Sequence, residues 1–411
     1  MYKQLSDSQK KIVSTYWTVI ATRELAMSFF ATTYVLFLLA RGLNLFEVNL
    51  VNTVFFITLF VFEIPTGVVA DVWGRKISVI ISFIFTTIGM ITYFFAQSFL
   101  ACAVAEAISA IGFTFMTGAF DAWLIDELKH RGYQEQTRWI FGRSQQIGKL
   151  LGLGGALLGA FVGSYNLALP WLGGALMLTG GIFSAIFLMK EESFTRRPYS
   201  VIAGWQEMGQ TFKAGLTYAK SSAPVRFLVA MGIIQSLGFM APNMQWTPWF
   251  KELLGSTTNL GFMWWGIALA LVLGAELAHA ITGKHNDKWL LVLTQIAIGL
   301  CVALVPLSRN LTYAVSAFLL HEFGRGLYRP LKDAYLNATI PSKQRATLLS
   351  LDAMSFHIGG AVGLVVSGAI ANTFGIATAW VLSGGLLIVG TLTMLFSVLR
   401  RDSLSLGKVY Q

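Results

Sequence analysis

Acidic and basic side chains stand inside segments of this chain that are otherwise apolar and about long enough to cross a membrane. A charge there costs about 2.5–3.5 kcal/mol even on lenient insertion scales, so each one needs a partner or a function. A buried carboxylate whose pKa rises towards neutrality can take up a proton, and a basic partner or a substrate can discharge it. The candidates for proton coupling and substrate binding are Glu24, Glu106, Glu276, His321, Glu322 and Arg325.

The spacing of two of these residues favours direct contact. Glu322 and Arg325 are three positions apart and share one face of a helix, so they can form an ion pair that lowers the insertion cost or a pair that switches. For each carboxylate the alternative is a permanently paired structural ion. His321 fits a proton site and equally fits a hydrogen-bonding residue of the core.

The elements that must hold these groups are transmembrane helices. The chain has 411 residues, of which 55% are hydrophobic and 12% charged, with a mean hydropathy of +0.64; soluble domains average about 25% charged residues. Alternation over about 10 residues, typical of barrel strands, is absent. Uncharged runs of spanning length cover residues 77–96, 227–250, 256–275 and 289–308.

Two longer uncharged stretches, 150–189 and 353–399, each predict two helices joined by a short turn. Further helices are expected near 16–40, 46–69, 99–127 and 310–337, which carry a few charges. The sequence therefore predicts an all-α membrane protein with twelve transmembrane helices.

The two halves of the chain resemble each other. Asp121-Ala122-Trp123-Leu124 in the fourth helix is echoed by Asp333-Ala334-Tyr335-Leu336 in the tenth, and such duplication is common in secondary transporters. We expect two pseudo-symmetric six-helix bundles, an N-terminal one over 1–189 and a C-terminal one over 224–411. Between them, 190–223 predicts a cytoplasmic linker with an amphipathic helix.

The net charge of +10 is distributed asymmetrically. Most of the 30 Lys and Arg residues fall on one predicted side of the membrane. Only Arg41, Lys251 and Arg309 fall on the other side, and Arg325 lies inside. This asymmetry predicts a multi-pass protein of the cell membrane with both termini in the cytoplasm, and it makes nucleic-acid binding a poor explanation of the charge. We also expect an uncleaved N-terminus.

Other kinds of chemistry lack their motifs. Cys102 and Cys301 sit in apolar helices without metal-ligand spacing, so no metal site is expected. The sequence contains no phosphate-binding loop of the ATPase type and no hydrolase motif. We therefore expect neither an enzyme nor a cofactor.

A hairpin between the second and third helices carries two glycines, a carboxylate and a basic pair. Gly67 would permit close helix approach and Gly74 a tight turn. Asp71 could accept hydrogen bonds at a neighbouring helix N-terminus. Arg75 could reach Asp121 or Asp126 at the cytoplasmic end of the fourth helix. The alternative is that these charges only anchor a loop at the membrane surface.

The segment Gly67 to Lys76 resembles the signature Gly-x-Leu-Ala-Asp-Arg-x-Gly-Arg-Lys of the major facilitator superfamily, at the place where that family has it. The helix count, the linker and the internal echo extend the resemblance over the whole chain. Val72 replaces the usual basic residue, and the copy expected after the eighth helix is eroded to residues 283–288. The resemblance implies that Asp71, Arg75 and Asp121 close the cytoplasmic side in the outward-facing state. We expect the same cytoplasmic gate to include Glu63, Gly67, Gly74, Lys76 and Asp126, with Glu63 as a partner of Arg23.

In that family, helices one, four, seven and ten line the transport cavity. The resemblance therefore adds Arg23, Gln235, Asn243 and Gln245 as cavity-lining candidates. The fifth helix carries Gly148, Gly152, Gly154, Gly155 and Gly159, which partly resemble the glycine pattern of drug/proton antiporters. Close helix packing is the alternative explanation of these glycines.

These observations together predict a secondary active transporter. We expect it to move a small organic molecule by alternating access, as a monomer in the lipid bilayer, with protons as the coupling ion and efflux as the direction. A proton-coupled importer and a non-transporting sensor of the same fold are the alternatives.

Overall fold

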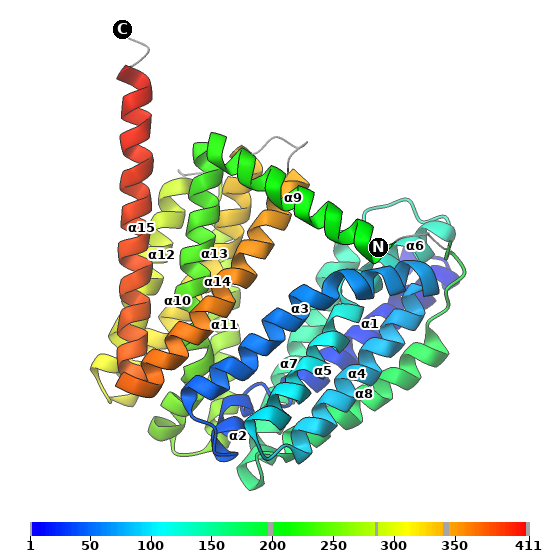
Figure 1. Cartoon of the computed structure of the whole chain (residues 1–411). Helices are drawn as coiled ribbons and strands as arrows, with labels where there is room; N and C mark the ends of the chain where they lie inside the picture. Colours follow the sequence, from blue (N-terminus) through cyan, green and yellow to red (C-terminus); the bar gives the residue numbers. More distant parts are fainter. Residues whose placement is uncertain (1, 196–199, 284–286, 340–344, 408–411) are drawn as a thin grey trace. The chain divides into compact units, whose positions relative to one another are not determined.

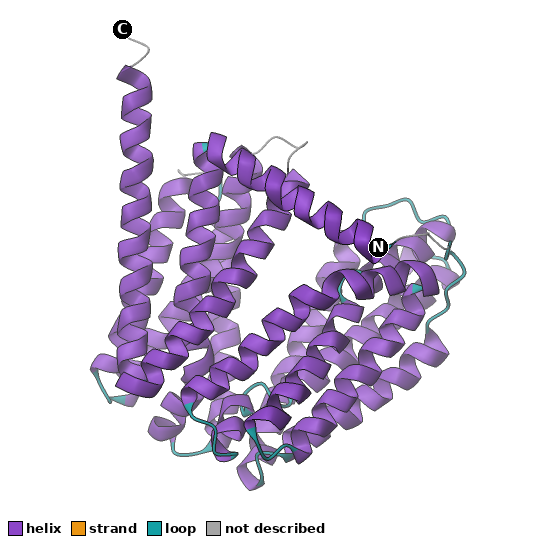
Figure 2. Cartoon of the chain, viewed as in Figure 1, coloured by secondary structure: helices purple, strands orange, loops and turns teal. Residues whose placement is uncertain are grey.

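The computed structural model describes residues 2–195, 200–283, 287–339 and 345–407, and all regular elements in these ranges are helices (Figures 1 and 2). This confirms the all-α prediction. Of the predicted linker and the second hairpin copy, residues 196–199 and 284–286 lie outside the described residues. The helices of the first half are α1 (Asp7–Ser28), α2 (Tyr34–Ala40), α3 (Leu45–Trp73), α4 (Arg75–Phe95), α5 (Phe99–Met116), α6 (Ala119–His130), α7 (Arg138–Tyr165) and α8 (Leu169–Leu188).

The second half begins with α9, which lies in the predicted linker. Its helices are α9 (Val201–Ser221), α10 (Ala223–Leu254), α11 (Thr257–Ile281), α12 (Asp287–Leu304), α13 (Leu311–Thr339), α14 (Arg345–Phe374) and α15 (Ile376–Gly407). Short 3₁₀ turns occupy Tyr2–Gln4 and Val305–Leu307.

Ten helical segments of the described chain are long and apolar enough to cross a membrane. The two other predicted spans correspond to α1 with α2, and to α13. α1 carries charges at both ends, among them Lys10 and Glu24, and α13 carries several, among them Glu322 and Lys332. Charged side chains lower the mean hydropathy of these helices, so they stand out less from composition alone.

Two helices predicted as continuous are interrupted. The predicted helix 16–40 divides into α1 and α2. Beside the break, the Ser28 hydroxyl donates a hydrogen bond to the Leu25 carbonyl and the Thr33 hydroxyl donates one to the Phe30 carbonyl. Such bonds compete with the regular hydrogen bonding of the helix. The predicted helix 99–127 divides into α5 and α6 at Thr117 and Gly118. Gly118 has a φ of 73°, a conformation that glycine adopts without strain.

Residue contacts divide the chain into two compact units. The first unit comprises Met1–Leu43, Val51–Trp205 and Leu254–Trp264. The second comprises Asn44–Leu50, Gln206–Leu253 and Trp265–Gln411. The main boundary falls inside α9, between Trp205 and Gln206.

In the first unit, α1 packs against α7 and α8, and α4 packs against α5 and α8. Glycines allow this close approach: a Cβ added to Gly159 of α7 would lie 1.7 Å from the Phe29 carbonyl oxygen, and one on Gly155 would lie 2.1 Å from the Ser28 hydroxyl. These distances support the packing interpretation of the α7 glycines. Stacked rings of Tyr93 and Trp171, 4.0 Å between centroids, fill the core nearby.

In the second unit, α12 packs against α13 and α15. Paired glycines again permit contact: Gly274 of α11 faces the Phe323 carbonyl, and Gly326 of α13 faces the Leu271 carbonyl, each with no room for a Cβ. Lipid does not drive helices together as water does, so small residues that increase van der Waals contact stabilise such pairs.

The packing gives a direct test. Gly159→Ala should lower the free energy of unfolding by about 1–3 kcal/mol, because the new methyl group must displace the backbone of Phe29. Gly154→Ala is the matched control, since a Cβ there meets no atom of the described chain within 4 Å. Thermal unfolding of the detergent-purified variants measures both. Equal melting temperatures would contradict the packing interpretation.

Candidate functional site

A cavity of about 350 Å³ lies within the first unit. Its walls come from α1, α5, α6 and α7, together with Thr117 and Gly118 at the break between α5 and α6. The charged residues of its lining are Arg23, Glu24, Asp121 and Lys149. The volume and the charges suit a small polar organic molecule.

Two charges of the cavity neutralise each other. Arg23 Nη1 lies 2.7 Å from Glu24 Oε1, and the Arg23 guanidinium also lies 5.2 Å from the centroid of the Phe113 ring. Gly148 of α7 makes room for this pair, because a Cβ there would lie 2.9 Å from Glu24 Cγ. The expected pairing of Arg23 with Glu63 is not formed, since Arg23 has the adjacent carboxylate as its partner.

Asp121 lines the cavity. It lies in the first turn of α6 and accepts a hydrogen bond of 2.6 Å from the Tyr16 hydroxyl of α1. Sequence reasoning missed Tyr16, because nothing in the spacing of residues 105 positions apart connects them. It also missed Gln145, which carries no spacing signal, and Lys149, which was grouped with the basic residues of the cytoplasmic side; both line the cavity from α7.

Glu106 of α5 lies elsewhere in the first unit. The residue is 7% exposed, and its carboxylate accepts a hydrogen bond from the Tyr93 hydroxyl, beside the stacked Trp171 ring. It does not line the cavity. Within the described residues Glu106 forms no ion pair, so its partner here is a phenol.

The second unit holds the predicted charge pair of α13. Arg325 Nη1 donates to both carboxylate oxygens of Glu322, at 2.8 and 2.6 Å, and the guanidinium stacks 3.9 Å from the Phe239 centroid. The Glu322 side chain is 4% exposed. His321 Nδ1 lies 3.5 Å from the same carboxylate and is buried without a hydrogen-bond partner in the described structure. The three residues therefore form one buried cluster.

The other candidates of the second unit are separated. Gln245 of α10 donates to the Ser367 carbonyl at 3.3 Å, and Gln235 is buried with its oxygen unpartnered within the described structure. Asn243 and Glu276 are exposed. Sequence reasoning missed Gln295 of α12, a fully buried amide, because a lone Gln in an apolar run carries no spacing signal.

Part of the predicted gate lies at the turn between α3 and α4. Gly74 makes this turn with a φ of 108°, and Arg75 forms an ion pair with Asp126 of α6. Of the two predicted partners of Arg75, the structure selects Asp126. Lys76 Nζ donates to the Ile186 carbonyl at the end of α8, at 2.8 Å.

Three gate predictions differ from the structure. Asp71 forms no hydrogen bond or ion pair with the described residues; the carboxylate at the N-terminus of α4 belongs to Glu191. A Cβ on Gly67 would meet no described atom within 4 Å, so no close helix approach occurs there. Glu63 faces the Thr117 hydroxyl rather than a basic residue.

Within the described chain, no group of three His, Cys, Asp or Glu side chains could hold a metal ion.

Comparison with known proteins bears on this arrangement. The sequence profile described as "Major Facilitator Superfamily" matches residues 16–331 and 268–408. An uncharacterised transporter of this type from Bacillus subtilis, YxaM, is 25% identical over 386 residues, covering 92% of this chain and 94% of the relative. A probable 4-methylmuconolactone transporter from Cupriavidus pinatubonensis is 22% identical, over 92% of this chain and 87% of its own.

Solved structures show the same fold. The nucleoside transporter NupG superposes with a TM-score of 0.74 at 13% identity, covering 95% of this chain and 98% of its own. A D-xylose–proton symporter gives 0.69 at 11% identity, covering 94% and 96%. These relatives and neighbours are transporters, and the protein is not an enzyme. The profile match, together with the helical fold and the hairpin between α3 and α4, shows that the chain belongs to the major facilitator superfamily of membrane transporters.

Proposed function

We propose that this protein exports a small organic molecule across the cell membrane by alternating access, in exchange for protons, as a monomer with both termini in the cytoplasm. The observation that carries the proposal is the buried cluster of Glu322, Arg325 and His321 in α13. In this cluster the buried side chains of Glu322 and His321 lie next to the guanidinium of Arg325. Such a group of residues is costly in a membrane helix and marks proton or substrate pathways.

The cluster can couple protons to cargo by competition. While Glu322 is ionised, it holds Arg325 through two hydrogen bonds. A cargo with a cationic group that takes the place of Arg325 binds only the ionised carboxylate of Glu322, whereas protonation of Glu322 removes the charge that this cargo needs. Cargo and proton therefore compete for Glu322, as the exchange of one for the other requires.

The cavity of the first unit supports a small polar cargo. Its Arg23–Glu24 pair is internally neutral, while Lys149 makes no ion pair with the described residues. The carboxylate of Asp121 has a phenol as its partner. A cargo can thus find both an anionic and a cationic group there. The relative described as a probable 4-methylmuconolactone transporter is in keeping with a small organic cargo.

The proposed cytoplasmic gate is the ion pair between Arg75 and Asp126. Arg75 and Asp126 join the turn after α3 to α6, and breaking this ion pair is one way to let the cytoplasmic ends of these helices separate. The outward direction is proposed because competition between cargo and proton for Glu322 favours exchange over symport. Proton symport is the second candidate, because one neighbour in fold is described as a D-xylose–proton symporter.

Vesicles with a proton gradient separate the two directions. Protein in sealed liposomes with an acidic lumen should accumulate a cargo from a panel of sugars, amino acids, organic acids and organic cations, as protons leave. A protonophore should abolish the uptake, and Glu322→Gln should uncouple it from the gradient. Accumulation only when the outer solution is acidic would mean symport and would overturn the export proposal.

The buried pair also makes a stability prediction. Arg325→Gln should lower the free energy of unfolding by about 3–5 kcal/mol, because it leaves the Glu322 charge buried without its partner. Glu322→Gln with Arg325→Gln should cost less than the sum of the single changes. Thermal unfolding in detergent measures the cycle.

The surface pair Arg309–Glu252, with side chains 62% and 65% exposed, is the control. Arg309→Gln should change stability by at most about 1 kcal/mol. Additive effects at Glu322 and Arg325 would show that the two residues do not act as a pair.

A further inference from the structure

The N-terminus of α4 receives its cap from a distant part of the chain. Its first residue follows Gly74, which has no side chain to accept the free N–H groups. The Arg75 N–H donates to Glu191 Oε1 at 2.6 Å, and the Lys76 N–H donates to Glu191 Oε2 at 3.1 Å. One carboxylate thus satisfies two otherwise unpaired donors, at the helix end where the dipole favours an anion.

The turn is shaped around this carboxylate. A Cβ on Gly74 would lie 2.6 Å from Glu191 Oε2, so any larger residue would push Glu191 away. Burial raises the pKa of the Glu191 carboxyl, while the N–H groups of Arg75 and Lys76 and the Arg75 charge oppose the rise, and the Glu127 charge adds to it. The site therefore holds a partly buried anion by directed hydrogen bonds.

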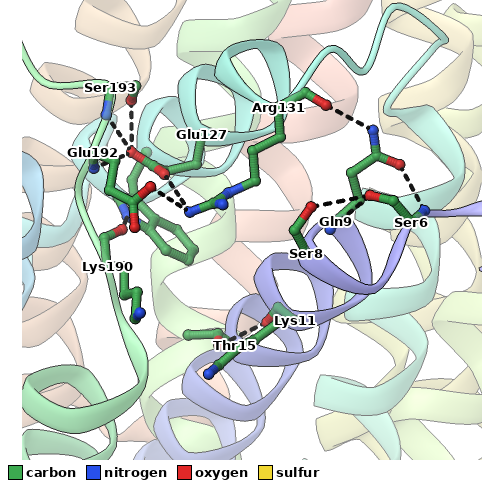
Figure 3. Close-up of polar contacts among 11 residues, drawn as sticks. Ser6, Ser8, Gln9, Lys11, Thr15, Glu127, Arg131, Lys190, Glu192 and Ser193 are labelled. Atoms are coloured by element: carbon green, nitrogen blue, oxygen red, sulfur yellow. Dashed lines mark hydrogen bonds and ion pairs between the residues drawn. The ribbon is translucent and has the colours of Figure 1, made fainter.

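The neighbours of Glu191 are fixed to α6 independently (Figure 3). Glu127 Oε1 accepts from the N–H groups of Glu192 and Ser193, each at 2.8 Å, and from the Ser193 hydroxyl at 2.7 Å. Arg131 pairs with Glu192 at 3.0 Å.

The residue before Glu191 is held in the same way. The Lys190 carbonyl accepts a 2.8 Å hydrogen bond from the Trp123 indole of α6. The start of the linker is consequently a rigid support for Glu191, held mainly by its own backbone.

We propose that Glu191 is a positioning residue of the cytoplasmic gate: by capping α4, it holds the turn at Gly74 where Arg75 can reach Asp126. The proposal rests on the proposed gate function of the Arg75–Asp126 pair. Its reason is geometric, since the backbone N–H of Arg75 bonds to Glu191 while the guanidinium of the same residue bonds to Asp126. Fixing the backbone of Arg75 limits where its guanidinium can go.

Hydrogen exchange tests the cap without any transport assay. In the full-length protein, Glu191→Ala should make the amides of the first turn of α4 exchange about tenfold faster or more, as expected from the loss of hydrogen bonds to a charged acceptor. Glu191→Gln keeps one oxygen acceptor and should give an intermediate rate. Glu192→Ala, which removes the adjacent carboxylate from the same segment, should leave these amides unchanged.

Transport rates test the positioning role separately. Glu191→Gln should lower the maximal rate about tenfold with an unchanged KM, and it should have little further effect in an Asp126→Asn background. Equal exchange in Glu191→Gln and the native protein would overturn the cap, and additive effects with Asp126→Asn would overturn the positioning role. If the chain proves not to transport, the exchange result still decides whether Glu191 is the cap.

Discussion

The cost of an unpartnered charge or backbone donor among apolar helices governs this structure. Water cannot satisfy such groups inside a bilayer, so each must find its partner within the protein. The described charges show three solutions: Arg325 lies one helical turn from Glu322, Arg23 is adjacent to Glu24, and Glu106 has a phenol. The first solution leaves the cation free to leave when the acid is protonated. Glu106 has no cationic partner among the described residues, so the buried glutamates of the two units differ in the group that they bind.

Close packing has a separate cause, since lipid does not drive helices together as water does. Backbones approach one another where glycines remove the side chain, as at Gly159 against Phe29 and at Gly274 against Phe323. The glycines of α7 that resemble an antiporter pattern serve this purpose in the described structure. A resemblance in sequence pattern therefore does not by itself identify a coupling device, because the same small residues are needed to bring α1 and α7 together.

The fold could be predicted from the sequence because each helix is marked by residues that lie close together along the chain. Runs of about 20 apolar residues mark most helices, and i, i+3 spacing predicts the Glu322–Arg325 pair without any knowledge of the packing. The broken helices were missed, since Gly118 resembles any other helical glycine until its positive φ is known.

Long-range pairs were beyond reach for a different reason. Tyr16 and Asp121 are 105 residues apart, and Arg75 and Glu191 are 116 apart, so only the packing of α1, α4, α6 and α8 brings them together. The motif between α3 and α4 limited the partners of Arg75 to two aspartates, and the rotation of α6 decided between them. Both aspartates lie on one short helix, and the sequence alone does not show which of them points toward Arg75; the structure pairs Asp126 with Arg75 and Asp121 with Tyr16.

The short helix α6 connects the cavity of the first unit to the turn between α3 and α4. α6 has 12 residues and begins at the glycine break; Asp121 in its first turn bonds to Tyr16 in the cavity, and Asp126 pairs with Arg75 at the turn. The two carboxylates are five residues apart, about 7.5 Å along the helix axis. Both carboxylates belong to one continuous helix, so α6 connects Tyr16 of the cavity to Arg75 of the turn. Glu127, one residue further on, ties the start of the linker to the same helix. On the proposed function, occupation of the cavity and opening of the turn therefore both act on α6, which also holds the start of the linker.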